Sequence, residues 1–70
     1  MTKDFIKWLA VEGLKKSIEE WSKLKERYIG YLSKETNDVV KNTWIYLIKQ
    51  VDDSIDYNNK LLKEVKDYEF

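Results

Sequence analysis

Apolar residues recur every seven positions in two halves of similar length, which lie on either side of the polar stretch 33–38. This repeat is typical of helices that pack along their length on other helices. In the first half it forms three adjacent columns: Leu14, Trp21 and Tyr28; Val11, Ile18 and Leu32, interrupted by Lys25; and Ala10, Ser17, Leu24 and Tyr31. We predict an all-α fold, an antiparallel helical hairpin with a first helix over about residues 3–32, a turn over about 33–37 and a second helix over about 38–68.

Polar residues stand where both helices are expected to begin. Thr2 or Asp4 can cap the first helix, and Asn37 or Asp38 can cap the second, because their side-chain oxygens accept hydrogen bonds from unpaired backbone N–H groups. The sequence contains no proline that would interrupt either helix. Two long helices of matched length with a short polar turn are typical of a single domain that spans residues 1–70.

Two positions could break this simple pattern. Gly13 costs about 1 kcal/mol relative to alanine in a helix, and the apolar residues before it, among them Phe5 and Trp8, are out of phase with the columns. A break near Gly13 would fold residues 3–12 back as a short helix and produce a three-helix bundle, which is the alternative fold. Asn58 and Asn59 are a second candidate break, although we favour a continuous helix because Asn58 lies in the apolar sector.

The apolar surface is wider than one hairpin can cover. At about 100° per residue, the second helix carries two apolar stripes, whereas contact with a single neighbouring helix needs only one. The first stripe contains Val40, Trp44, Leu47, Ile48, Val51, Ile55, Leu62 and Val65, and the second contains Val39, Tyr46, Tyr57, Leu61 and Tyr68. The apolar face of the first helix, with three adjacent columns, is also wider than the contact between the helices of a two-stranded coiled coil. We therefore expect a homodimer in which two hairpins form a four-helix bundle.

Composition supports association and argues against several other classes of protein. A chain of 70 residues is of marginal size for an independent fold, and without Cys or His it lacks disulfides and the usual structural zinc ligands. There is no run of about 18 apolar residues, so we expect no membrane-spanning segment. We also recognise no secretory signal at the N-terminus, and we expect a cytoplasmic protein.

Few residues are suited to chemistry. Without His or Cys the usual general base and thiol nucleophile are missing, so we expect no enzyme, no cofactor and no metal site. Asp52, Asp53 and Asp56 form the one dense acidic cluster. We interpret it as a solvated helix face, since hard cations need six or more oxygen ligands.

Basic residues are concentrated in the first helix and make nucleic-acid binding the second hypothesis. Some of these cations, and one in the second helix, stand four residues after an acidic residue, which predicts the ion pairs Glu12–Lys16, Glu19–Lys23 and Asp56–Lys60. Only one of the 13 cations is an arginine, whose planar fork suits base and phosphate recognition. Both observations make nucleic acid the weaker choice of partner.

Two sets of apolar residues are therefore the candidate sites for a partner or for dimerisation: Phe5, Trp8 and Leu9 at one end, and Tyr46, Tyr57, Leu61 and Tyr68 along the second helix. Large aromatic residues are enriched at protein interfaces. We expect a non-catalytic protein–protein interaction module, an adaptor or stoichiometric inhibitor of the kind that viruses and other mobile elements encode. A nucleic-acid-binding hairpin dimer and a small structural or assembly subunit are the alternatives.

Overall fold

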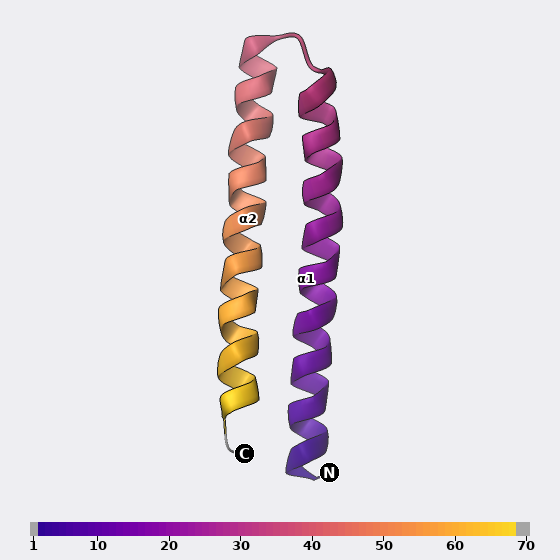
Figure 1. The fold of residues 1–70 in the computed structure, drawn as a ribbon, viewed down its shortest axis with the longest axis vertical. Coiled ribbons are helices and arrows are strands. Elements are labelled where there is room, and N and C mark those ends of the chain that lie inside the picture. The colour runs from indigo at the N-terminus through magenta and orange to yellow at the C-terminus, as the bar shows by residue number, and fades with distance from the viewer. Residues whose placement is uncertain (1, 69–70) are drawn as a thin grey trace.

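The computed structural model describes residues 2–68 and consists, over these residues, of two long antiparallel helices (Figure 1). Helix α1 spans Lys3–Lys34 and helix α2 spans Asp38–Asp67. They lie side by side, so the first turn of α1 and the last turn of α2 are both at the end of the rod away from the turn, which we call the open end. The predicted all-α hairpin is confirmed.

Short polar residues determine where each helix begins. The Thr2 hydroxyl accepts a hydrogen bond from the Phe5 N–H at 3.2 Å. The Asn37 side-chain oxygen accepts from the N–H groups of Val39 and Val40 at 2.9 and 3.2 Å, which satisfies two of the otherwise unpaired donors of the first turn of α2. Both caps were among the predicted alternatives.

The turn between the helices is stabilised by a single carboxylate. Glu35 Oε1 accepts hydrogen bonds from the backbone N–H groups of Thr36 and Asn37, each at 3.0 Å. The Glu35 N–H itself donates to the carbonyl of Leu32 at 3.2 Å and closes the last turn of α1. Three residues therefore suffice to reverse the chain without a glycine.

Neither candidate break interrupts a helix. Gly13 lies inside α1 with no positive φ, so the three-helix alternative is wrong. The cost of one glycine, about 1 kcal/mol, is smaller than the gain from extending the contact with α2 over three further turns. Asn58 remains helical because its side-chain N–H donates to the carbonyl of Ser54, one turn earlier, at 2.7 Å. The expectation that α2 is continuous is confirmed.

The two helices share one narrow seam and almost no closed core. Among residues 2–68 only Val51 is buried, with 4% of its surface exposed, while the other apolar residues along the seam are half-buried. The Trp44 ring forms the largest contact, with its centroid 5.3 Å from that of Tyr28 and 5.1 Å from that of Tyr31. Val40, expected in the core, is 38% exposed because it stands in the first turn of α2, where no third element covers it.

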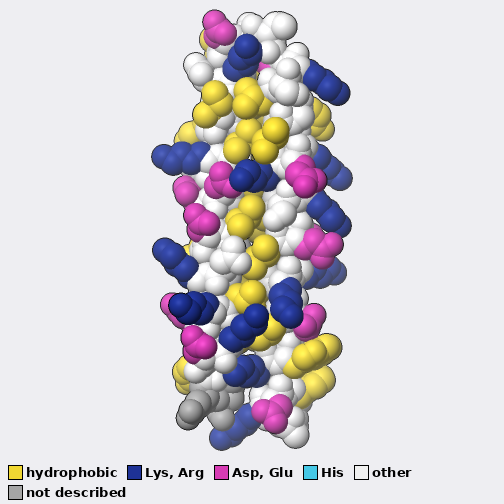
Figure 2. Space-filling view, in the orientation of Figure 1, with side chains coloured by type: hydrophobic (Ala, Val, Ile, Leu, Met, Phe, Trp, Pro, Cys, Tyr) yellow, Lys and Arg dark blue, Asp and Glu magenta, His cyan; other side chains and the backbone are white. Residues whose placement is uncertain are grey.

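Polar contacts bridge the helices on one side of this seam. The Lys25 ammonium pairs with the carboxylate of Asp52, and the Lys7 ammonium donates to the backbone carbonyl of Lys66. The space-filling view shows this side, where a row of apolar side chains between the helices is flanked and crossed by charged ones (Figure 2). Together with the Tyr28–Trp44 contact, these bridges define which residues of α1 and α2 lie at the same level along the rod.

The Asn37 cap gives a direct test of the turn. We predict that Asn37→Ala lowers the free energy of unfolding by about 1 kcal/mol, because two N–H groups of α2 lose their acceptor. The midpoint of thermal unfolding, followed by helical circular dichroism, should fall by about 4–8 °C. Thr36→Ala is the matched control, since the Thr36 side chain accepts no such bond, and equal midpoints for the two variants would contradict the assigned cap.

Candidate interaction surfaces

Large apolar side chains remain exposed over much of the described hairpin. They fall into groups at the open end of α1, near the turn, and along the side of α2. The members are Phe5, Ile6, Trp8, Leu9, Ile29, Tyr31, Val39, Val40, Ile45, Tyr46, Tyr57 and Tyr68. Two of these groups are extensive enough to describe as surfaces.

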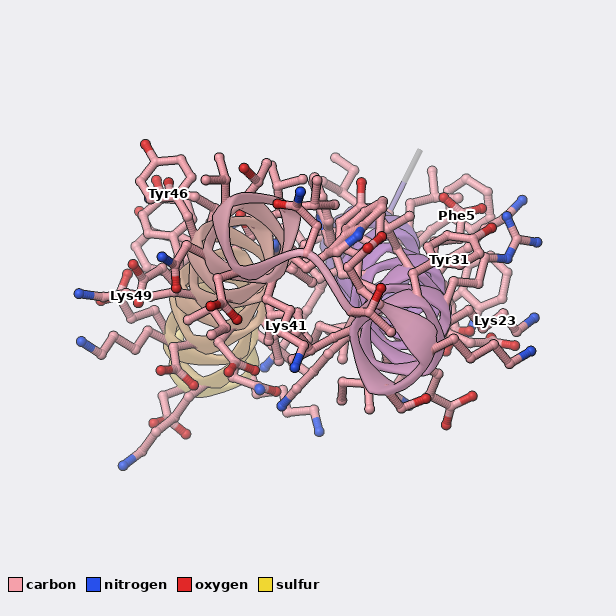
Figure 3. All side chains as sticks on the ribbon, turned by 90° about the horizontal axis from the view of Figure 1, so that it is seen from above. Phe5, Lys23, Tyr31, Lys41, Tyr46 and Lys49 are labelled. Carbon is pink, nitrogen blue, oxygen red and sulfur yellow. The ribbon has the colours of Figure 1, made fainter. Side chains whose placement is uncertain are left out.

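The first surface is the Phe5–Trp8 patch, which we define as Phe5, Ile6, Trp8 and Leu9 near the open end of α1. The Phe5 and Trp8 rings are stacked, with centroids 6.0 Å apart and planes inclined by 23°, because residues three apart are neighbours on a helix. Trp8 is 56% exposed. Phe5 points away from α2 in the view down the rod (Figure 3). The patch thus lies outside the seam between the helices.

The second surface is the tyrosine face, formed on α1 by Gly13 and Tyr31 and on α2 by Thr43, Tyr46, Tyr57 and Leu61. Gly13 and Tyr31 are separated by five turns of about 3.6 residues and point in the same direction, as do Thr43 and Leu61. Tyr46 and Tyr31 point to the upper side of the view in Figure 3, whereas Lys41 points to the lower side.

The lower side of that view, which is the side shown in Figure 2, is the lysine face, and Lys41 points to it. Asp52 and Lys66 follow Lys41 at close to whole numbers of helical turns, so they lie on the same side of α2, and Lys25 and Lys7 of α1 contact them. We define the lysine face by these five residues. Its charged groups bridge the two helices directly. The two broad faces of the rod therefore differ: charge spans one of them, and rings and small residues occupy the other.

The structure divides the predicted site residues between these surfaces. Phe5, Trp8 and Leu9 are exposed in the patch, and Tyr46 and Tyr57 are exposed on the tyrosine face. Leu61 is half-buried at the edge of the seam. Tyr68, which follows α2, is exposed at the open end, and its N–H donates to the carbonyl of Val65.

Four members of these surfaces were not among the predicted site residues: the small residues Gly13 and Thr43, and the large apolar residues Tyr31 and Ile6. Tyr31 was assigned to a packed column of the first helix, yet its ring reaches the edge of Trp44 and stays half-exposed. Ile6 was not singled out, although it is as exposed as Phe5. The spacing of Tyr31 from Gly13, five helical turns, is the signal that could have placed both residues on one face of the helix.

The expected ion pairs are only partly present. Glu19 pairs with Lys23 at 3.1 Å, as predicted. Glu12 pairs with Lys15 at 3.7 Å and not with Lys16, and within residues 2–68 Asp56 forms no ion pair with Lys60, so both of those predictions are wrong. Partners three and four residues away compete on a helix surface, and the small gain from an exposed pair does not fix one long side chain.

The described residues offer little to a reaction. A shallow open hollow of about 370 Å³ is lined by α1 alone, through Ser17, Glu20, Trp21 and Leu24. Within residues 2–68, three or more metal-ligating side chains do not gather at any point, and neither α1 nor α2 has a stretch long and apolar enough to cross a bilayer. Comparison with protein-family models, curated proteins and solved structures finds no match to this chain.

The effects of replacing Trp44 and Trp8 on stability test whether the Phe5–Trp8 patch lies outside the contact between the helices. We predict that Trp44→Ala lowers the free energy of unfolding by at least about 2 kcal/mol, since it removes the ring that joins α1 to α2. Trp8→Ala should change it by less than about 0.5 kcal/mol, because Trp8 is 56% exposed and its ring stacks on Phe5 of the same helix. Urea unfolding followed by circular dichroism measures both, and a larger loss for Trp8→Ala would mean that the patch belongs to the core.

Proposed function

We propose that this protein is a non-catalytic protein–protein interaction module that works as a homodimer, two hairpins forming a four-helix bundle. One observation carries the proposal. Among the described residues one side chain is buried, whereas a dozen large apolar side chains are exposed. A chain that places so many rings and aliphatic groups in water gains free energy when another surface covers them.

The exposed area is large enough for such an interface. The structure exposes 5670 Å². A compact monomer of 8.5 kDa would expose about 4,650 Å² by the usual scaling of surface with mass. The excess of about 1,000 Å² is similar to the roughly 800 Å² that each partner buries in a stable protein complex. Self-association therefore accounts for most of the uncovered surface.

The Phe5–Trp8 patch is the proposed contact with a larger protein. Phe5 points away from α2 and its ring is stacked on that of Trp8, so a second hairpin packed on a broad face of the rod leaves these two rings accessible. Stacked aromatic rings supply a rigid apolar anchor of the type that dominates the binding energy of protein interfaces. Two patches on one dimer suit an adaptor or a stoichiometric inhibitor, for which we propose action in the cytoplasm.

Nucleic-acid binding is the second candidate because α1 is basic. It holds eight basic and five acidic residues, a net charge of +3. However, Lys15, Lys23 and Lys25 are each paired with a carboxylate, which weakens the positive field available to phosphates. The role of a small assembly subunit is compatible with the same surfaces and differs only in the partner.

The patch can be tested by replacing Trp8 with a photo-crosslinking amino acid in cells that produce the protein. We predict one dominant adduct heavier than the dimer, sensitive to protease and resistant to nuclease. Phe5→Ala in the same chain should reduce the adduct about tenfold, which corresponds to the loss of about 1.4 kcal/mol from an aromatic anchor.

Lys23 is the matched control position, since it is exposed on the same helix away from the patch. An adduct at position 23 as strong as at position 8 would contradict a specific protein contact. A nuclease-sensitive adduct would instead replace the proposal with nucleic-acid binding.

A further inference from the structure

Three contacts define the register between α1 and α2, that is, which residues of the two helices lie at the same height along the rod. Tyr28 lies against Trp44, Lys25 against Asp52, and Lys7 against Lys66. Continued along the helices, this register places Tyr31 level with Thr43, and Gly13 level with Leu61. Each of these two levels therefore has one small and one large residue on the tyrosine face.

Small and large residues alternate between the helices on this face. Near the turn, α1 carries the half-exposed ring of Tyr31 and α2 carries the small Thr43, whose hydroxyl donates to the carbonyl of Val39 in its own helix. Near the open end the order is reversed, because α1 carries Gly13 and α2 carries Leu61. A side chain at Gly13 would meet nothing within 4 Å, so the space above it is open. At each of these two levels, one helix therefore carries a large side chain and the other carries a small one.

The outer edges of the same face are complementary in chemistry. Arg27 on α1 lies level with Tyr46 on α2, and Lys16 lies level with Tyr57 by the same register. Both tyrosines are well exposed, at 62% and 64%. Cations favour the faces of aromatic rings, so these edges attract each other when an α1 is placed opposite an α2.

The net charges of the helices also favour an α1 placed opposite the α2 of another copy. Helix α1 has eight basic and five acidic residues, a net +3, whereas α2 has five basic and six acidic residues, a net −1. Placing α1 against a second α1 would bring two positive helices together. Placing it against α2 joins opposite charges, which sets orientation more than affinity.

We propose that a second copy of this chain covers the tyrosine face with both turns at the same end, so that α1 of each hairpin lies against α2 of the other. The two-fold axis then runs along the rod. Leu61 of each copy fills the space over Gly13 of the other, and Tyr31 of each lies over Thr43 of the other. This arrangement deepens the homodimer proposed above and rests on it. It leaves in solvent the lysine face and the stacked rings of Phe5 and Trp8, whereas Ile6, seven residues before Gly13, lies at the edge of the covered face.

The opposite arrangement, with the turns at opposite ends, satisfies fewer of these constraints. It would place α1 against α1 and α2 against α2. Like charges would then be adjacent, and the cations at the edge of α1 would not meet the tyrosines of α2.

Because the chain has no cysteine, the arrangement can be tested with single cysteines on the full-length protein. Glu20 and Gln50 are exposed polar residues. Glu20 follows Gly13 by seven residues and Gln50 follows Thr43 by seven, so both lie on the side of the tyrosine face, about one helical turn apart along the rod by the same register. We predict that a mixture of the Glu20→Cys and Gln50→Cys proteins, treated with a short bismaleimide, yields mainly the crosslinked heterodimer. The Lys15→Cys and Asn59→Cys proteins are the control, since these positions lie at one level on the opposite face and should crosslink at least tenfold less.

The outcomes separate the arrangement from the dimer itself. If Glu20→Cys crosslinks mainly to itself, or the control pair crosslinks as well as the test pair, the arrangement is overturned and the homodimer stands. If light scattering of the unmodified protein gives the mass of a monomer at micromolar concentration, the homodimer and the arrangement both fail.

A second pair of variants tests the face without crosslinking. Tyr46 and Ile45 are neighbours on α2 with similar exposure, 62% and 53%, but they lie about 100° apart around the helix. Tyr46→Glu places a charge on the tyrosine face and should weaken dimerisation at least tenfold in sedimentation equilibrium. Ile45→Glu lies on the lysine side and should leave it unchanged, and a larger effect of Ile45→Glu would overturn the assigned face.

Discussion

Two helices placed side by side touch along one line, and this constraint governs the rest of the structure. A helix in a bundle is covered by several neighbours, whereas here α1 and α2 have only each other. Over residues 2–68 the result is one buried residue, Val51, and a wide band of apolar groups in solvent on a rod with Cα extents of 53 × 15 × 12 Å. A core this thin gives little free energy against the conformational entropy of ordering about 65 residues. Because the sequence has no cysteine or histidine for disulfides or a zinc site, association with another chain is the remaining way to add stability.

The two broad faces of the rod differ in which side chains border the exposed apolar groups. Bridges from Lys25 to Asp52 and from Lys7 to Lys66 span the lysine face. Removing those groups from water would cost more than the bridges return, so this face favours solvent. The tyrosine face has no such bridge among its members, and its amphipathic rings tolerate both water and contact. The two broad faces of one hairpin therefore differ in the free-energy cost of covering them, which is lower for the tyrosine face.

Much of the fold could be predicted from the sequence because it follows from local rules. The seven-residue columns determine the helices, and the oxygen of Asn37 determines where the second one begins. The exposure of Val40 could not be predicted, since it depends on which neighbours reach the first turn of α2. The pairing of Glu12 with Lys15 depends on the rotamer of a solvated side chain, for which the sequence carries no strong preference. The division of the apolar residues into two surfaces required the register between the helices, which emerges only when both are placed.

Thermal unfolding over a wide range of protein concentration tests most directly whether a second copy stabilises the hairpin by covering it. For a dimer that unfolds to separate chains, mass action raises the midpoint as the concentration rises. If the proposed homodimer forms, the midpoint of helical circular dichroism should shift clearly upward across a hundredfold increase in concentration. A cooperative transition whose midpoint does not change over that range would show that one hairpin is stable alone and would contradict the proposed homodimer.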